Sequence, residues 1–279
     1  MMRRRTFLTA GAATLAMPYA ARADDAARLS FSGTTEQGAL VIGKAQGGAK
    51  ISVDDAPVSV SQEGLFAFGL AYDRTKPIRV VAQFADGQNE TRIIAPVVRQ
   101  YVVQRINGVP QKFVTPSPEE LERIKRENAL IHEARKRDTD SIGFARPFDW
   151  PFPGIVSGVY GSQRIDNGTP MAPHLGIDIA APEGTPIHAP ADAVVSICDD
   201  YFLDGGFTLL DHGHGVSSCY LHQSKRMVAA GDKVARGQVF GLVGRTGRAT
   251  GPHMHWGLNW FQLKLDPSRS TVTPEPPKA

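Results

Sequence analysis

Cysteine is scarce in this chain of 279 residues, where only Cys198 and Cys219 occur. Neither cysteine has a partner at the spacing of a metal-binding thiolate pair, which excludes a cysteine-ligated ion. A disulfide between the two stays open, because bridged Cα atoms lie within about 7 Å and we expect a strand to run between them. The sequence therefore favours two free thiols over a bridge.

A membrane-spanning run is also missing from the sequence. Residues 1–23 place three consecutive arginines before a short apolar stretch that ends in small residues, and this pattern is typical of an export signal. The letters RRTFL at residues 4–8 resemble a twin-arginine signal, and an ordinary secretory signal is the alternative. We therefore expect export to the periplasm and a mature protein without a membrane span.

Charge of either sign is not in excess in the expected mature chain. Removal of residues 1–23 takes away four arginines and no acid, which leaves 27 basic against 28 acidic residues. This balance gives no support for a nucleic-acid partner.

The first part of the mature chain lacks the residues that usually carry chemistry. Residues 24–105 contain no histidine and no cysteine, and they consist of short alternating runs such as ALVIGKA, LFAFGLA and IRVVAQFADG. Turn residues break these runs every eight to twelve positions, a rhythm that predicts a small antiparallel β-sandwich. We expect this domain to have a structural or binding role rather than a catalytic one.

A linker at residues 106–145 contains the only strong helix signal. Ser117 and Glu120 form a capping-box pattern and Pro118 takes the first helical position, which predicts a helix over residues 117–137. Its apolar seam is narrow, so we expect the helix to lie across a surface or between domains. A charged, mostly solvated connector is the simpler interpretation, and a lid over a catalytic groove is the alternative.

The remainder of the chain returns to β structure. Residues 146–268 carry runs that are punctuated by glycine and proline, with no long helical pattern among them. This predicts a mainly antiparallel β domain, whereas the proline-rich tail at residues 269–279 is expected to be disordered. The chain as a whole is thus predicted to be mainly β, with an N-terminal β-sandwich, a connecting helix and a C-terminal antiparallel β domain.

Histidines gather in this C-terminal domain, since seven of the eight lie after residue 170. His253 and His255 are two residues apart, so in a strand both side chains project to one face. The same rule predicts that Tyr220 and His222 share a face, which can meet the face that carries the first pair. One histidine alone is more often a core or surface residue, but the joint pattern indicates a site.

A third segment completes a set of possible metal ligands. His174 and Asp178 are four residues apart, so they reach one ion only if the chain bends between them, which Gly176 permits. Two histidines and one aspartate are a sufficient ligand set for catalytic zinc, which keeps its fourth position for water. Two further histidines could then accept the proton of that water and stabilise the developing oxyanion.

These segments resemble the lysostaphin or LytM-type zinc peptidases, which are β-rich enzymes that cut peptide bonds in bacterial peptidoglycan. The resemblance covers about residues 150–262, through GSQRIDNG, HLGIDIAAPEGTPIHAP, DHGHGVSSCYLH and GDKVARGQVFGLVGRTGRATGPHMHWGL. It implies that His174, Asp178 and His255 bind zinc and that His222 and His253 are the catalytic pair.

Weaker candidates for contact with the substrate are Tyr220, Arg164 and His212. Tyr220 stands where the family has a tyrosine two residues before its first catalytic histidine, and Arg164 lies in a segment where the family often has an arginine. His212 and His214 belong to a glycine-rich turn, and we expect them to be structural or at the edge of the groove, with His212 the nearer to the site.

The resemblance implies a zinc-dependent endopeptidase that hydrolyses peptidoglycan stem-peptide cross-links, with metal-bound water as the nucleophile. The twin-arginine-like signal and the periplasmic setting suggest a Gram-negative cell, in which stem peptides are often joined directly. By analogy, this favours D,D-endopeptidase action over cleavage of glycine bridges. The alternatives are a non-catalytic LytM-fold regulator of other wall hydrolases and a zinc peptidase that acts on proteins. No predicted ligand position is lost, which argues against the regulator, and the sequence identifies no regulatory partner.

Overall fold

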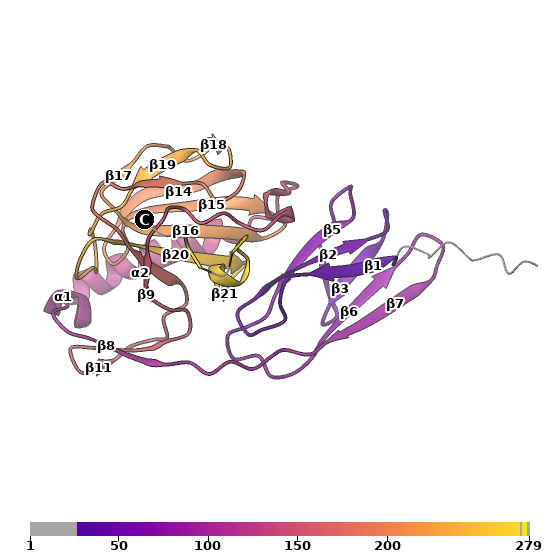
Figure 1. The fold of residues 1–279 in the computed structure, drawn as a ribbon, viewed down its shortest axis with the longest axis horizontal. Helices are drawn as coiled ribbons and strands as arrows, with labels where there is room; N and C mark the ends of the chain where they lie inside the picture. Colours follow the sequence, from indigo (N-terminus) through magenta and orange to yellow (C-terminus); the bar gives the residue numbers. More distant parts are fainter. Residues whose placement is uncertain (1–26, 274, 278–279) are drawn as a thin grey trace, which may run out of the picture.

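The computed structural model describes residues 27–273 and 275–277, so the expected export signal at residues 1–23 lies outside the described residues. A small N-terminal β module and a larger C-terminal β domain are joined by an extended connector and a helix (Figure 1). This architecture confirms the predicted fold class. Within the described residues, no helix is both long enough and apolar enough to cross a membrane.

The N-terminal module is an antiparallel sandwich of two sheets. One sheet has the order β1-β2-β5 and the other β4-β3-β6-β7. Their bounds are β1 (Leu29–Ser32), β2 (Leu40–Ala45), β3 (Lys50–Val53), β4 (Ala56–Val58), β5 (Leu65–Gly69), β6 (Ile78–Gln83) and β7 (Asn89–Ile94). Alternation along β6 buries Ile78, Val80 and Ala82 and exposes Arg79. The buried residues pack with residues of the other sheet, so both sheets contribute to one shared core.

The connector between the domains is structurally part of the C-terminal domain. It contains β8 (Val103–Ile106), α1 (Gln111–Val114) and α2 (Pro118–Ala134). Strand β8 pairs in parallel with β10 (Gln163–Asp166), which in turn pairs with β11 (Thr169–Pro170). The predicted capping box begins α2, because Ser117 Oγ accepts from the Glu120 amide and the Glu120 carboxylate accepts from the Ser117 amide.

The C-terminal domain is built on one large sheet. Its path is β18-β14-β15-β16-β20-β12-β9, with β21 paired to β20, and a second sheet β13-β19-β17 lies in the same domain. The bounds are β9 (Ile155–Gly158), β12 (Ile177–Ala180), β13 (Pro186–His188), β14 (Ala193–Tyr201), β15 (Gly205–Gly213), β16 (Val216–Gln223), β17 (Lys225–Arg226), β18 (Lys233–Val234), β19 (Val239–Leu242), β20 (His253–Trp260) and β21 (Leu263–Leu265), with the short 3-10 helices η1 (Gly143–Ala145) and η2 (Pro267–Arg269).

The two faces of the large sheet have different roles. Met254, Trp256 and Leu258 of β20 are fully buried and pack with Phe240 of β19 in the main core. The alternate residues of β20, which include His253 and His255, therefore project to the opposite face. The sheet thus separates a dry core from the face that carries the histidines.

Of two expectations at the edges of this domain, one is confirmed and one is wrong. Cys198 and Cys219 are free, because β15 lies between β14 and β16, the strands that carry them. The tail is not disordered over its first residues, since Thr271 forms a bridge with Phe148 and the Thr273 carbonyl accepts from Trp150 Nε1 at 3.0 Å. Disorder was the wrong expectation for this part of the tail.

Helix α2 packs on the face that carries the histidines. Ile131 is 7% exposed and belongs to a cluster with Phe207 and Cys219 of that face. Glu127 Oε2 also accepts from the Phe202 amide at 2.9 Å, which fixes the helix to the chain after β14. The expectation of a mostly solvated connector therefore fails for the inner side of this helix.

We predict that Ile131→Ala lowers the free energy of unfolding by about 2 kcal/mol or more, because it leaves a cavity under α2. Leu130→Ala is the matched control, since Leu130 is 57% exposed and a surface truncation changes stability by about 0.5 kcal/mol or less. Urea unfolding measures both values, and equal values would show that α2 does not dock through Ile131.

Candidate metal and catalytic site

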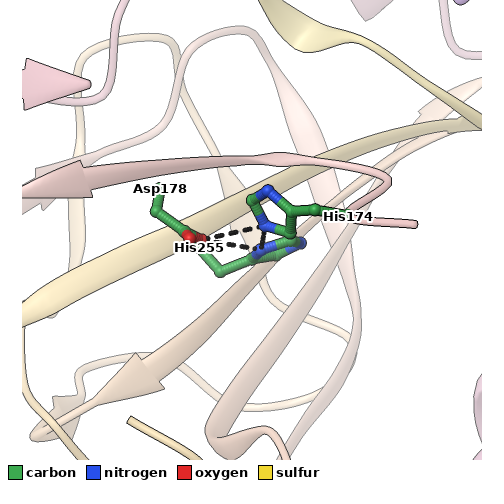
Figure 2. A group of neighbouring side chains, drawn as sticks. All are labelled: His174, Asp178 and His255. Atoms are coloured by element: carbon green, nitrogen blue, oxygen red, sulfur yellow. Dashed lines mark hydrogen bonds and ion pairs between the residues drawn. The ribbon is translucent and has the colours of Figure 1, made fainter. Parts of the chain in front are cut away.

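The three predicted ligands meet at one point between β12 and β20 (Figure 2). Asp178 Oδ1 lies 3.1 Å from His174 Nε2 and 3.0 Å from His255 Nδ1, and the two nitrogens are 2.8 Å apart. Asp178 stands directly opposite His255 in the antiparallel pairing of β12 with β20, whereas His174 comes from the segment before β12. The arrangement brings two imidazoles and one carboxylate oxygen to a common centre.

Gly176 is needed in this arrangement for its lack of a side chain. A Cβ at Gly176 would lie 2.4 Å from His255 Nε2 and Cε1, which no packed structure accepts. The sequence suggested that Gly176 permits a bend between His174 and Asp178. The structure adds a steric reason, because only glycine leaves room for the His255 ring.

Asp178 is a buried carboxylate, with 7% of its surface exposed. Burial alone would raise its pKa, but hydrogen bonds and charge interactions with His174 and His255 outweigh burial and hold the pKa well below its ordinary value. Asp178 is therefore ionised at neutral pH. Burial lowers the pKa of His255 to about 4 despite the opposing effect of Asp178, so this imidazole is neutral and able to bind a metal.

Arg164 has a different place from the one that the sequence suggested. Its Nη2 donates to Asp178 Oδ2, the carboxylate oxygen that does not face the two histidines. We expected Arg164 to contact substrate, but the structure engages its guanidinium with a predicted metal ligand. Arg164 therefore orients the Asp178 carboxylate so that Oδ1 faces His174 and His255.

His222 and His253 form a second pair beside this centre, with ring centroids 4.7 Å apart. His222 Nδ1 lies 2.8 Å from the Thr246 carbonyl, and His253 Nδ1 lies 2.8 Å from the Gly251 carbonyl. A carbonyl only accepts, so each Nδ1 carries the proton in a neutral ring and each Nε2 is left as a proton acceptor. Burial, and next the neighbouring His253, lower the pKa of His222 to about 3, which keeps this ring neutral.

The backbone of His222 explains how its side chain reaches this position. His222 has φ of 66°, in the left-handed region that a residue with a Cβ rarely adopts and that costs about 1 kcal/mol. This conformation interrupts the alternation of side chains along β16. The sequence contains no signal for it, nor for the two carbonyls that orient the pair.

Tyr220 does not share a face with His222, so that prediction is wrong. Tyr220 pairs directly with Trp256, is fully buried on the core face, and lies 2.8 Å from Ser218 Oγ through its hydroxyl. The prediction assumed regular alternation through His222, and the left-handed residue breaks it. A side chain with no exposed surface cannot contact a substrate.

His212 is also a core residue and not a group at the edge of the groove. It is fully buried, with Nδ1 3.0 Å from the Asp192 carbonyl and Nε2 2.7 Å from Ser218 Oγ. Because Nδ1 donates to a carbonyl, Nε2 accepts from the serine. His214, in the same turn, places Nδ1 3.1 Å from the Ser59 carbonyl and so contacts the N-terminal module.

Comparison with known proteins agrees with a peptidase of the LytM type. A model of peptidase family M23 matches residues 172–267. This segment includes the three predicted ligands and the pair formed by His222 and His253. A solved Pseudomonas aeruginosa structure, assigned to peptidase M23, is 31% identical over 84% of this chain and 94% of its own, with a TM-score of 0.60. The chain therefore belongs to peptidase family M23.

Two curated relatives match the same part of the chain. The Vibrio cholerae peptidoglycan DD-endopeptidase ShyA is 46% identical over 88 residues, which cover 32% of this chain and 20% of ShyA. The Neisseria meningitidis DD-carboxypeptidase/endopeptidase Mpg is 45% identical over 103 residues, which cover 37% and 24% of the two chains. The matches thus span about a fifth to a quarter of these relatives.

We predict that stability falls as the pH drops from 6.5 to 4, in part through His212. Burial lowers the pKa of His212 to about 4, whereas the unfolded chain binds this proton below about pH 6.5. The stabilisation is therefore complete above pH 6.5 and decreases by up to about 1.4 kcal/mol per pH unit below it. Urea unfolding at several pH values with a chelator present measures this slope.

His212→Gln should unfold with a smaller slope against pH than the wild type, whatever its absolute stability. His132→Gln is the control, because His132 lies on the exposed side of α2 and should leave the slope unchanged. An unchanged slope in His212→Gln would contradict the assignment of His212 as a buried neutral histidine.

Proposed function

We propose that this protein is a zinc-dependent endopeptidase that hydrolyses peptide cross-links of peptidoglycan. The observation that carries the proposal is the meeting of His174, Asp178 and His255 beside a second, oriented histidine pair. Membership of a peptidase family supports the reaction class, and the names of the two curated relatives support the substrate.

The residues of the first group fit a zinc ion. Two imidazole nitrogens and one carboxylate oxygen are a common ligand set for catalytic zinc. Zinc bonds of 2.0–2.1 Å in a tetrahedron place ligand atoms about 3.3 Å apart, and the three separations here are 2.8, 3.0 and 3.1 Å. Movements of a few tenths of an ångström would therefore admit the ion.

The histidine pair supplies the proton transfers in this proposal. Zinc, when bound, acts as a Lewis acid that polarises the scissile carbonyl and makes a water molecule more acidic. The free Nε2 of His222 or His253 takes a proton from the attacking water and later returns it to the leaving nitrogen. The Thr246 and Gly251 carbonyls keep both rings in the tautomer that this role needs.

Arg164 acts in the same proposal as a positioning residue. Its contact with Asp178 Oδ2 leaves Oδ1 as the single oxygen directed to the metal position. The guanidinium also places a positive charge beside this buried carboxylate and holds it in one orientation.

We propose D,D-endopeptidase action on directly joined stem peptides. The names of ShyA and Mpg both contain this activity, and identities of 46% and 45% over the matched segments support the transfer. The non-catalytic regulator is disfavoured because the three proposed ligands lie together and the two proposed catalytic histidines form a pair beside them. Export to the periplasm, proposed from residues 1–23, would bring the protein to this substrate.

We predict that His255→Ala loses bound zinc and activity together, whereas His253→Ala keeps much of the zinc and loses most of its turnover. The difference arises because His255 belongs to the ligand group and His253 only to the neighbouring pair. Metal analysis of the purified proteins and release of cross-linked muropeptides measure the two effects. His132→Ala, on the exposed side of α2, is the control and should behave as the wild type.

We also predict that a chelator abolishes hydrolysis of purified wall and that added zinc restores it. Mass spectrometry of the muropeptides identifies the bond that is cut. Equal wall clearing by the wild type and His255→Ala would refute the zinc-peptidase proposal, and cleavage of casein but not of wall would assign the activity to protein substrates.

A further inference from the structure

Thr246 makes three contacts with the end of strand β16, and each of them bears on His222. Its carbonyl accepts from His222 Nδ1 at 2.8 Å, and its amide donates to the His222 carbonyl at 3.4 Å. Its hydroxyl Oγ1 donates to the carbonyl of the next residue, Gln223, at 3.0 Å. Thr246 therefore contacts the ring of His222, its main chain and the residue that follows it.

The hydroxyl of Thr246 also bridges strands β15 and β16. Oγ1 accepts from the Gly206 amide at 2.9 Å while it donates to the Gln223 carbonyl. Gly206 and Gln223 are direct partners in the antiparallel pairing, and the register shifts just beyond them, between Gly206 and Thr208. A hydroxyl has both the hydrogen and the lone pairs that such a bridge needs. The bridge thus lies directly beside His222, the residue that interrupts the alternation along β16.

The start of β15 leaves room for this hydroxyl. A Cβ at Gly205 would lie 2.3 Å from Thr246 Oγ1, and a Cβ at Gly206 would lie 2.4 Å from the Gln223 carbonyl oxygen. A side chain at either position would push β15 away from Thr246. The close approach of the hydroxyl to both strands therefore depends on these two glycines.

The contacts of Thr246 oppose the cost of the His222 backbone conformation. A left-handed residue with a Cβ persists only where its surroundings over-determine it, and His222 has φ of 66°. Its amide donates to the Asp204 carbonyl at 2.8 Å, and Thr246 holds its carbonyl and its ring. Without the hydroxyl, the buried Gly206 amide and the buried Gln223 carbonyl would each lose a hydrogen-bond partner. The end of β16 would then relax and change the direction of the His222 ring.

We propose that Thr246 is a positioning residue, whose hydroxyl holds His222 in its left-handed conformation and so keeps its ring beside His253. This inference rests on the proposed endopeptidase function, in which the histidine pair transfers protons. It goes beyond that function because it assigns a role to a hydroxyl that bonds to two backbone groups. Thr246 is itself exposed, so removal of its hydroxyl leaves no cavity in the core.

The test measures the turnover of a soluble dimer of directly joined stem peptides by the zinc-loaded protein. Thr246→Val removes the hydroxyl and keeps the shape of the side chain. Its kcat should fall at least about tenfold, while KM and the zinc content stay at the wild-type values. Thr246→Ser restores the hydroxyl and should keep most of the turnover. An equal fall of kcat in both variants, or a loss of zinc from Thr246→Val, would overturn the role of the hydroxyl.

A double variant shows whether Thr246 acts through His222. His222→Ala should have little turnover, and Thr246→Val added to it should not lower kcat further, because the effects of residues that act as a unit are not additive. A further fall of about tenfold in the double variant would refute the proposal, since Thr246 would then act independently of His222.

Thr271→Val is the matched control for the loss of a threonine hydroxyl. The Thr271 hydroxyl also donates to a backbone carbonyl, that of Ser268, at 3.1 Å, but it lies in the C-terminal segment that pairs with Phe148. Its kcat should equal that of the wild type. Thermal unfolding of each variant checks that it is folded.

Amide hydrogen exchange tests the bridge independently of activity. The Gly206 amide donates to Thr246 Oγ1, so its exchange, measured by NMR, should be at least about tenfold faster in Thr246→Val than in the wild type or Thr246→Ser. Equal protection in the wild type and Thr246→Val would refute the bridge and leave the endopeptidase proposal intact. Faster exchange in Thr246→Val, with no cleavage of the peptide dimer by the wild type, would refute the endopeptidase and support the bridge.

Discussion

The compensation of one buried negative charge organises this site. The Asp178 carboxylate lies in the sheet with little exposure, and an isolated charge in that position would be very costly. Two imidazoles contact one of its oxygens and Arg164 contacts the other. The lack of a side chain at Gly158 leaves room for the carboxylate, since a Cβ there would lie 2.3 Å from Asp178 Oδ2. The Asp178 side chain thus links β10, through Arg164, to β20, through His255, in addition to the backbone pairing of β12 with β20 and β9.

Around this charge, the two groups of histidines are held in different ways. The ligand group is held by contacts among its own side chains, so its shape depends on the carboxylate at its centre. The pair of His222 and His253 is held by backbone carbonyls, which select the tautomer and leave the outer nitrogens free. This division gives one region suited to a cation and an adjacent region suited to proton transfer.

Sequence reasoning succeeded where regular geometry holds and failed where it is broken. The two-residue spacing correctly placed His253 and His255 on one face of β20, and the family resemblance correctly grouped His255 with His174 and Asp178. The same spacing rule failed for Tyr220, because the left-handed backbone of His222 reverses the alternation at the end of β16. Arg164 bonds to Asp178, 14 residues away, and His212 bonds to the Asp192 carbonyl, 20 residues away, and no local pattern reports these contacts.

The parallel pairing of β8 with β10 has a consequence for which part of the chain forms a complete domain. The segment that the family model matches, residues 172–267, contains both histidine groups but neither of these strands. A fragment limited to residues 172–267 would therefore lack both strands and, with β10, the contact of Arg164 with Asp178. The smallest unit that keeps the Asp178 carboxylate fully compensated is therefore larger than the segment that the family model matches.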